Sequence, residues 1–98
     1  MSRPVFFRRI AELEFDDSAR WYEFQRPGLG SEFKQEVAQA LGRISDAPEQ
    51  FPKIRGNVRR AVLRKFPFSI HFLSDETRIT VLAVFQGNRD PARMQNRR

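Results

Sequence analysis

The feature that most constrains the fold is a break, Pro27-Gly28-Leu29-Gly30, between two stretches with the apolar spacing of helices. Neither proline nor glycine sustains a helix, so the chain must turn there. The first stretch runs from about residue 12 to residue 25, with Phe15, Ala19 and Tyr22 on one stripe and Leu13, Trp21 and Phe24 widening it. In the second stretch, Ser31 can cap a helix that must end by Ala47, and the apolar stripe is Phe33, Val37, Leu41 and Ile44. Two helices joined by so short a loop predict a helical hairpin.

Extended segments flank this hairpin. Val5-Phe6-Phe7 is a short strand candidate before it, and residues 48–57 are expected to be a loop. Three strands should follow, over residues 58–65, about 67–73, and 79–85, the last apolar on both faces as a central strand is. The order β-α-α-β-β-β predicts an α+β fold with a small, mainly antiparallel sheet. The helical hairpin should pack on one face of the sheet and leave the other face open.

Composition limits the function classes. A chain of 98 residues forms one domain, and the absence of cysteine excludes disulfides, thiolate metal sites and cysteine nucleophiles. With one histidine, an ordinary transition-metal site is excluded too. There is no glycine-rich phosphate loop of the nucleotide-binding kind, and no apolar run long enough for a membrane span. We therefore expect a cytoplasmic protein that needs no cofactor or metal and has no membrane partner.

Positive charge is concentrated in the second half of the chain. Residues 1–50 hold 7 Lys and Arg against 9 Asp and Glu, whereas residues 51–98 hold 11 against 3, net +8. Arg60 and Arg64 should share one face of the strand expected over residues 58–65, while Arg59 points to the other. This pattern favours a polyanionic or acidic partner. The alternative is that these arginines are solvated charges that protect an edge strand from aggregation.

Several short motifs occur in a specific order along the chain. They are Trp21-Tyr22-Glu23, Pro27-Gly28-Leu29-Gly30 with Phe33, Ile44 with Pro48, Val58-Arg59-Arg60, Phe66-Pro67-Phe68, Val81-Leu82-Ala83-Val84 and Arg89-Asp90-Pro91. In order and spacing they resemble the RelE/ParE superfamily of bacterial type II toxin–antitoxin modules, and most closely its ParE-like branch. The resemblance implies the β-α-α-β-β-β fold, as one domain over residues 1–91 with a short basic tail over residues 92–98.

The resemblance also implies two possible modes of action. RelE-like toxins cut messenger RNA in the ribosome with basic residues and a C-terminal Tyr or His, whereas ParE-like toxins poison DNA gyrase by binding. In both kinds an antitoxin wraps the toxin and keeps it inactive. This sequence has Gln86 and Met94 where RNA-cleaving members often have histidine and an aromatic residue. Glutamine cannot transfer a proton and methionine cannot stack on a base as an aromatic ring does, so the departure argues against a nuclease.

The first hypothesis is therefore a ParE-like toxin that binds and inhibits DNA gyrase and forms a hetero-oligomer with its antitoxin. The residues expected to bind the target are Arg59, Arg60, Arg64 and Arg89. Trp21 and Phe24 are expected to bind the antitoxin, because Phe15, Ala19 and Tyr22 already fill the inward stripe of their helix.

Two alternatives remain open. One is a ribosome-dependent ribonuclease in which Arg60, Arg64 and Arg89 bind phosphate and His71, whose ordinary pKa lies near neutrality, moves a proton. The other is a nucleic-acid-binding module with no toxicity.

Overall fold

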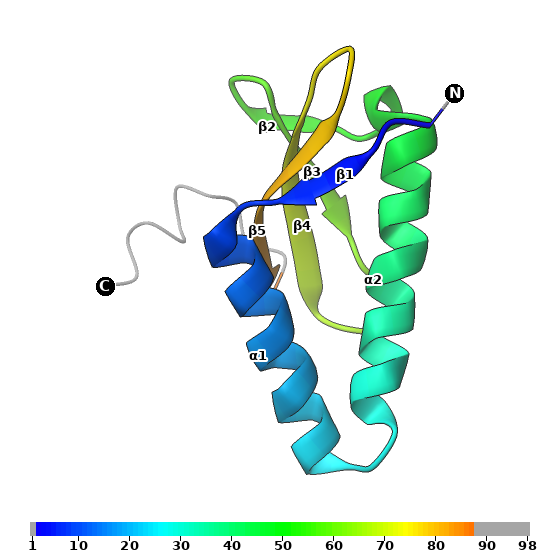
Figure 1. Ribbon diagram of the computed structural model, residues 1–98, viewed down its shortest axis with the longest axis vertical. Coiled ribbons are helices and arrows are strands. Elements are labelled where there is room, and N and C mark those ends of the chain that lie inside the picture. The colour runs from blue at the N-terminus through cyan, green and yellow to red at the C-terminus, as the bar shows by residue number, and fades with distance from the viewer. Residues whose placement is uncertain (1, 88–98) are drawn as a thin grey trace.

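Residues 2–87 are described by a computed structural model in which a helical hairpin lies against a twisted sheet (Figure 1). The elements, in chain order, are β1 (Val5–Phe7), α1 (Arg9–Gln25), α2 (Leu29–Asp46), a 3-10 turn η1 (Pro48–Gln50), β2 (Lys53–Arg55), β3 (Val58–Val62), β4 (Phe68–Ser74) and β5 (Ile79–Gln86). In Figure 1, α1 descends from the end of β1 and α2 returns beside it, joined by a tight loop.

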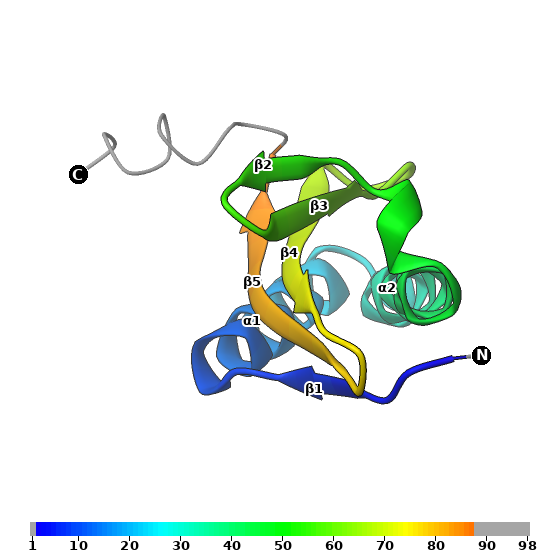
Figure 2. The same cartoon turned by 90° about the horizontal axis from the view of Figure 1, so that it is seen from above.

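The sheet has the strand order β1-β5-β4-β3-β2. β1 pairs with β5 in parallel, and the other three pairings are antiparallel. Seen from above, β1 lies at one end of the twisted sheet, with β2 and β3 at the other (Figure 2). The α+β architecture and the interior position of β5 are therefore confirmed.

The loop between the helices is fixed by the side chain of Glu23. Its carboxylate accepts hydrogen bonds from the backbone N–H groups of Gly28, at 2.9 Å, and Gly30, at 3.0 Å. Gly28 has a φ of 92°, a left-handed conformation that favours glycine. The carboxylate thus satisfies N–H groups at the start of α2 that the helix itself leaves free. The prediction that Ser31 caps this helix is wrong: α2 begins at Leu29, because Glu23 from the preceding helix supplies the acceptor.

Gly30 lies inside α2, where the two helices approach most closely. A Cβ atom on Gly30 would lie 2.6 Å from the backbone oxygen of Ala19 and 2.9 Å from Oε1 of Glu23. Both contacts are shorter than van der Waals packing permits. The absence of a side chain at residue 30 therefore sets how closely α1 and α2 can pack.

An aromatic cluster fills the space between the hairpin and the sheet. Tyr22 of α1 and Phe33 of α2 each pack against Phe66 and Phe68, with ring centroids between 4.9 and 6.0 Å apart. Edge-on and tilted contacts between aromatic rings stabilise the fold beyond what the burial of their apolar surface contributes. Phe68, Ile70 and Phe72 lie on the face of β4 that contributes to this core.

The segment after α2 is more ordered than the sequence indicated. The expected loop over residues 48–57 contains the turn η1 and the three-residue edge strand β2, which pairs with β3 across a Gly56-Asn57 turn. A strand of three residues is too short to produce an alternating pattern, although Gly-Asn between apolar residues is a hairpin signal. The strand expected over residues 58–65 ends at Val62, and α1 begins at Arg9 rather than near residue 12.

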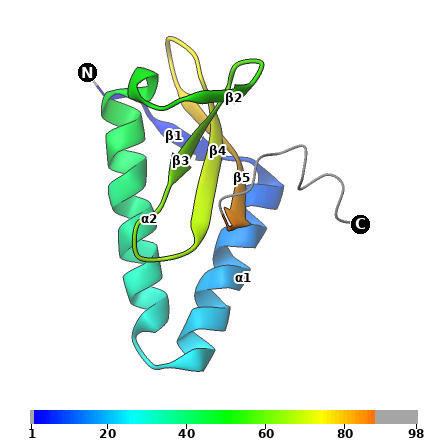
Figure 3. The same ribbon diagram turned by 180° about the vertical axis from the view of Figure 1, so that it is seen from behind.

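The short β1 leaves part of β5 without a strand neighbour. β1 pairs only with residues 79–81 of β5, and beyond that point Oε1 of Glu14 on α1 accepts the N–H of Val84 at 2.8 Å. Burial of the Glu14 carboxyl raises its pKa, and the hydrogen bond from Val84 partly opposes that rise. Helix α1 lies beside β5 (Figure 3), and this side-chain hydrogen bond joins the helix to the sheet where β1 ends.

We predict that Gly30→Ala lowers stability by about 1–3 kcal/mol, because the added methyl group forces the helices apart. For a domain of this size, the thermal midpoint should fall by about 5 °C or more. Gly42→Ala is the matched control: Gly42 lies in the same helix with open space around its Cβ position, so alanine there should be neutral or stabilising. Equal midpoints for the two variants would contradict the close approach at Gly30.

Candidate functional site

The sheet face turned away from the aromatic cluster is defined by the register of β3, β4 and β5. Arg60 is the cross-strand partner of His71, which is the partner of Ala83. Since opposite residues in a sheet project to the same side, Arg60 and His71 share this face. Ser69 and Phe85 are the next partners along the same face. We call Arg60, Ser69, His71 and Phe85 the outer sheet face.

His71 is buried within this face rather than displayed on it. Its side chain is 4% exposed, and its ring packs edge-on against Phe85 with centroids 4.7 Å apart. Burial, followed by the positive charges of Arg60 and Arg55, lowers the pKa of His71 to about 4. The imidazole is therefore neutral near pH 7, and its Nε2 atom has no hydrogen-bond partner among the residues that the structure describes. A neutral imidazole can accept a proton, but one this buried does not meet a substrate.

Arg59 and Arg60 point to opposite sides of β3, as the alternation predicts. Arg59 is the cross-strand partner of the core residue Phe72, and its Nη1 donates to the backbone oxygen of Phe51 at 2.6 Å. A longer bond of 3.4 Å reaches the oxygen of Glu49. These bonds join Arg59 to the segment between α2 and β2, so it has a structural role in this state. Arg60 is half-buried on the outer sheet face.

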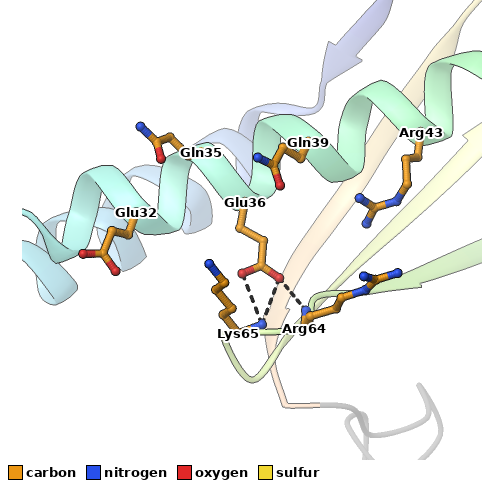
Figure 4. Close-up of a pocket in the computed structure, with 7 residues that line it drawn as sticks. All are labelled: Glu32, Gln35, Glu36, Gln39, Arg43, Arg64 and Lys65. Carbon is orange, nitrogen blue, oxygen red and sulfur yellow. Dashed lines mark hydrogen bonds between the residues drawn. The ribbon is translucent and has the colours of Figure 1, made fainter.

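Arg64 does not lie beside Arg60, because β3 ends two residues before it. The backbone N–H groups of Arg64 and Lys65 both donate to the carboxylate of Glu36 on α2, the latter at 2.9 and 3.1 Å. Arg64 therefore lies against α2, with its side chain toward a cleft beside that helix (Figure 4). Arg89, the fourth residue expected to bind the target, lies outside the described residues, as does Met94.

An exposed apolar stripe runs along the outward face of α1. Trp21 is 56% exposed and Phe24 is 89% exposed, as predicted, while Ala19 and Tyr22 are buried. Ile10 and Leu13 are exposed on the same helix, and the four residues recur at i, i+3, i+11 and i+14, which places them on one side. We call Ile10, Leu13, Trp21 and Phe24 the α1 apolar face.

Sequence reasoning missed part of this surface. It placed Leu13, Trp21 and Phe24 at the margin of the inward stripe and did not single out Ile10. The available signal was that the inward stripe is already complete, so further apolar residues on the helix must lie elsewhere. A small hollow beside Trp21 is lined by Ser18, Trp21, Tyr22, Phe68 and Gln86. The α1 apolar face therefore adjoins a depression able to receive a partner's side chain.

Two negative findings apply to residues 2–87. No three His, Cys, Asp or Glu side chains there are grouped as they would need to be to hold a metal ion. Neither helix of this part of the chain combines the length and apolar character needed to cross a lipid bilayer.

The arrangement of helices and strands in this chain has a counterpart among solved structures. Among solved structures, a chain of the "Chromosomal ParDE TA system from P. aeruginosa" superposes with a TM-score of 0.76 and 19% sequence identity. The match covers 89% of this chain and 98% of that one. No family model and no curated protein sequence matches this sequence. The fold that the sequence motifs implied by resemblance is therefore confirmed.

We predict that His71 makes the protein less stable in mild acid. The unfolded imidazole titrates near 6.5 and the folded one near 4, so between these values the unfolded state binds more protons and stability falls as the pH is lowered. From pH 7 to pH 5 the loss should be about 2 kcal/mol. Urea unfolding at both pH values should show a smaller loss for His71→Gln, which cannot titrate. Glu14 is present in both proteins, so its contribution cancels, and identical losses would contradict the assignment.

Proposed function

We propose that this chain is the toxin of a type II toxin–antitoxin module, of the ParE-like kind, and that an antitoxin neutralises it in the cytoplasm. The observation that most supports this is the α1 apolar face on a ParE-like fold. A solved structure with that fold is described as a ParDE toxin–antitoxin system. The basic net charge of +6 favours an acidic partner.

The α1 apolar face has the properties of a protein-binding surface. Trp21 and Phe24 are among the residue types enriched at the centres of interfaces, and both are exposed although the core beneath them is complete. Asp17 and Arg20, paired at 3.4 Å, lie beside them and provide a polar margin. The occupant we propose is an amphipathic segment of the antitoxin. One of its apolar side chains would enter the hollow between Trp21, Tyr22 and Phe68.

For the target, we propose that the toxin binds and inhibits DNA gyrase. Two observations favour binding over catalysis. The side chains of His71 and Tyr22 are both buried, and burial raises the pKa of Tyr22, so neither is suited to transfer a proton to a substrate. Gln86, at the position where RNA-cleaving relatives often have histidine, has no ionisable proton. Arg60, with Arg59, Arg64 and Arg89, would provide basic contacts to the target.

The experiment that tests the target is controlled expression of the chain in bacteria, followed by assays of the purified protein. Under the proposal, growth stops, and the purified protein inhibits supercoiling by gyrase. Unaffected growth would contradict a toxin of any kind. Growth arrest with normal supercoiling and rapid loss of messenger RNA would contradict the gyrase assignment and favour the ribonuclease, in which Arg60 and His71 are cross-strand neighbours.

We predict that Phe24→Ser weakens the antitoxin complex by at least about tenfold while the toxin still arrests growth, because a fully exposed interface residue is lost without damage to the core. The partner to be sought for this test is a short acidic protein encoded next to this gene. Binding can be followed through Trp21, the one tryptophan of the chain, whose fluorescence should shift to shorter wavelength on burial. Phe6→Ser is the control, since Phe6 is a half-exposed phenylalanine on β1. Equal weakening by both variants, or by neither, would contradict the α1 apolar face as the antitoxin site.

A further inference from the structure

A second surface of the molecule is a polar cleft between α2 and the turn that joins β3 to β4, lined by three positive side chains and two carboxylates (Figure 4). Its α2 wall contributes Gln35, Gln39 and Arg43, and the turn contributes Arg64 and Lys65. We call this surface the α2 cleft. It belongs to α2, whereas the α1 apolar face belongs to the other helix of the hairpin (Figure 3).

The two carboxylates that border the α2 cleft have other partners. Glu36 accepts the backbone N–H groups of Arg64 and Lys65, which fixes the turn against the helix (Figure 4). Glu32 pairs with Arg26 at 3.3 Å. The negative charge at the cleft is thus engaged with the main chain of the turn and with a residue of the loop between the helices. The turn that presents Arg64 and Lys65 is held in place by Glu36 before any ligand binds.

The positively charged side chains of the cleft, unlike Glu32, have no partner of opposite charge among the ion pairs of residues 2–87. None of those pairs includes Arg43, Arg64 or Lys65. Arg43 lies in the last turn of α2, where the helix dipole favours a positive charge, so its position has a structural explanation. The same explanation does not apply to Arg64 and Lys65. Three positive side chains border the cleft against the two carboxylates Glu32 and Glu36, so the lining keeps an excess of positive charge that would attract an anion.

We propose that the α2 cleft binds the phosphate backbone of a nucleic acid strand. Guanidinium groups match the oxygens of a phosphate with paired hydrogen bonds, and a lysine ammonium adds a charge contact beside them. Gln35 and Gln39, one helical turn apart, add carboxamide groups that can donate to phosphate or sugar oxygens. From residue 32 to residue 43 the α2 wall is about 16 Å long, enough for more than one phosphate of a strand.

This site differs from the contacts expected on the outer sheet face. Arg64 lines this cleft together with Arg43 and Lys65. Arg60 is not part of it, because Arg60 lies within β3 and the strand ends before Arg64. The inference does not rest on toxicity or on gyrase. A nucleic-acid contact on α2 would remain available while a partner covers α1.

The test measures binding of the intact chain to a fluorescently labelled 20-base-pair DNA duplex and to a single-stranded RNA of 20 nucleotides, by anisotropy at several salt concentrations. The double variant Arg43→Gln/Arg64→Gln should lose about tenfold or more in affinity for at least one probe. Its dependence of log affinity on log salt should become shallower by about 2, roughly one for each lost phosphate contact.

The control is Arg8→Gln/Arg9→Gln, which removes the same charge from exposed positions at the start of α1. It should change affinity by less than about twofold, since neither side chain borders the α2 cleft. Equal losses in the two double variants would show diffuse attraction and overturn the proposal, as would no binding of either probe. If a polyglutamate peptide binds as tightly as the nucleic acids with the same dependence on Arg43 and Arg64, the ligand is an acidic protein segment and the nucleic-acid assignment is wrong. These outcomes do not depend on growth arrest, so they are distinguishable from a failure of the proposed function.

Discussion

The carboxylate of Glu23 and the missing side chain of Gly30 together fix how the two helices meet. The carboxylate accepts the N–H groups of Gly28 and Gly30, and a Cβ atom on Gly30 would collide with the backbone of α1. The helices therefore touch near the loop, which brings Tyr22 and Phe33 to within 5.3 Å of each other between ring centroids. Phe66 of the β3–β4 turn and Phe68 of β4 then pack against this pair. The close approach of α1 and α2 at Gly30 thus positions the two rings against which the sheet packs.

The same arrangement explains why the molecule has separate surfaces. With its inward stripe used by the core, α1 has apolar residues left over, and they face solvent. Helix α2 uses its inward stripe in the same core, and its polar side holds the β3–β4 turn through Glu36. Contacts within the protein, apolar packing and hydrogen bonds, therefore occupy part of the surface of each helix. The α1 apolar face and the α2 cleft beside Glu36 remain available to partners of different chemistry, an apolar segment on α1 and an anion beside α2.

The candidate site was only partly predictable, and the arginines show why. Alternation along a strand correctly put Arg59 and Arg60 on opposite sides, since that depends on backbone geometry alone. It failed for Arg64, because the strand ends at Val62 and the chain turns toward α2. Nothing local in the sequence indicates that Glu36, 28 residues earlier, would hold this turn. His71 is a similar case: its place on β4 was predictable, whereas its burial against Phe85 depends on how β4 and β5 pair.

The sequence by itself determined the order of the elements other than β2, the break between the helices, the buried stripe that contains Phe33, and the interior position of β5. These features follow from local rules of periodicity, chain stiffness at proline and glycine, and burial of apolar residues. Only the tertiary structure decided which acceptor caps α2, where β3 ends, and which charged groups meet. Those outcomes depend on contacts between residues far apart in the chain, and the energy of such a contact exists only once packing has brought its partners together.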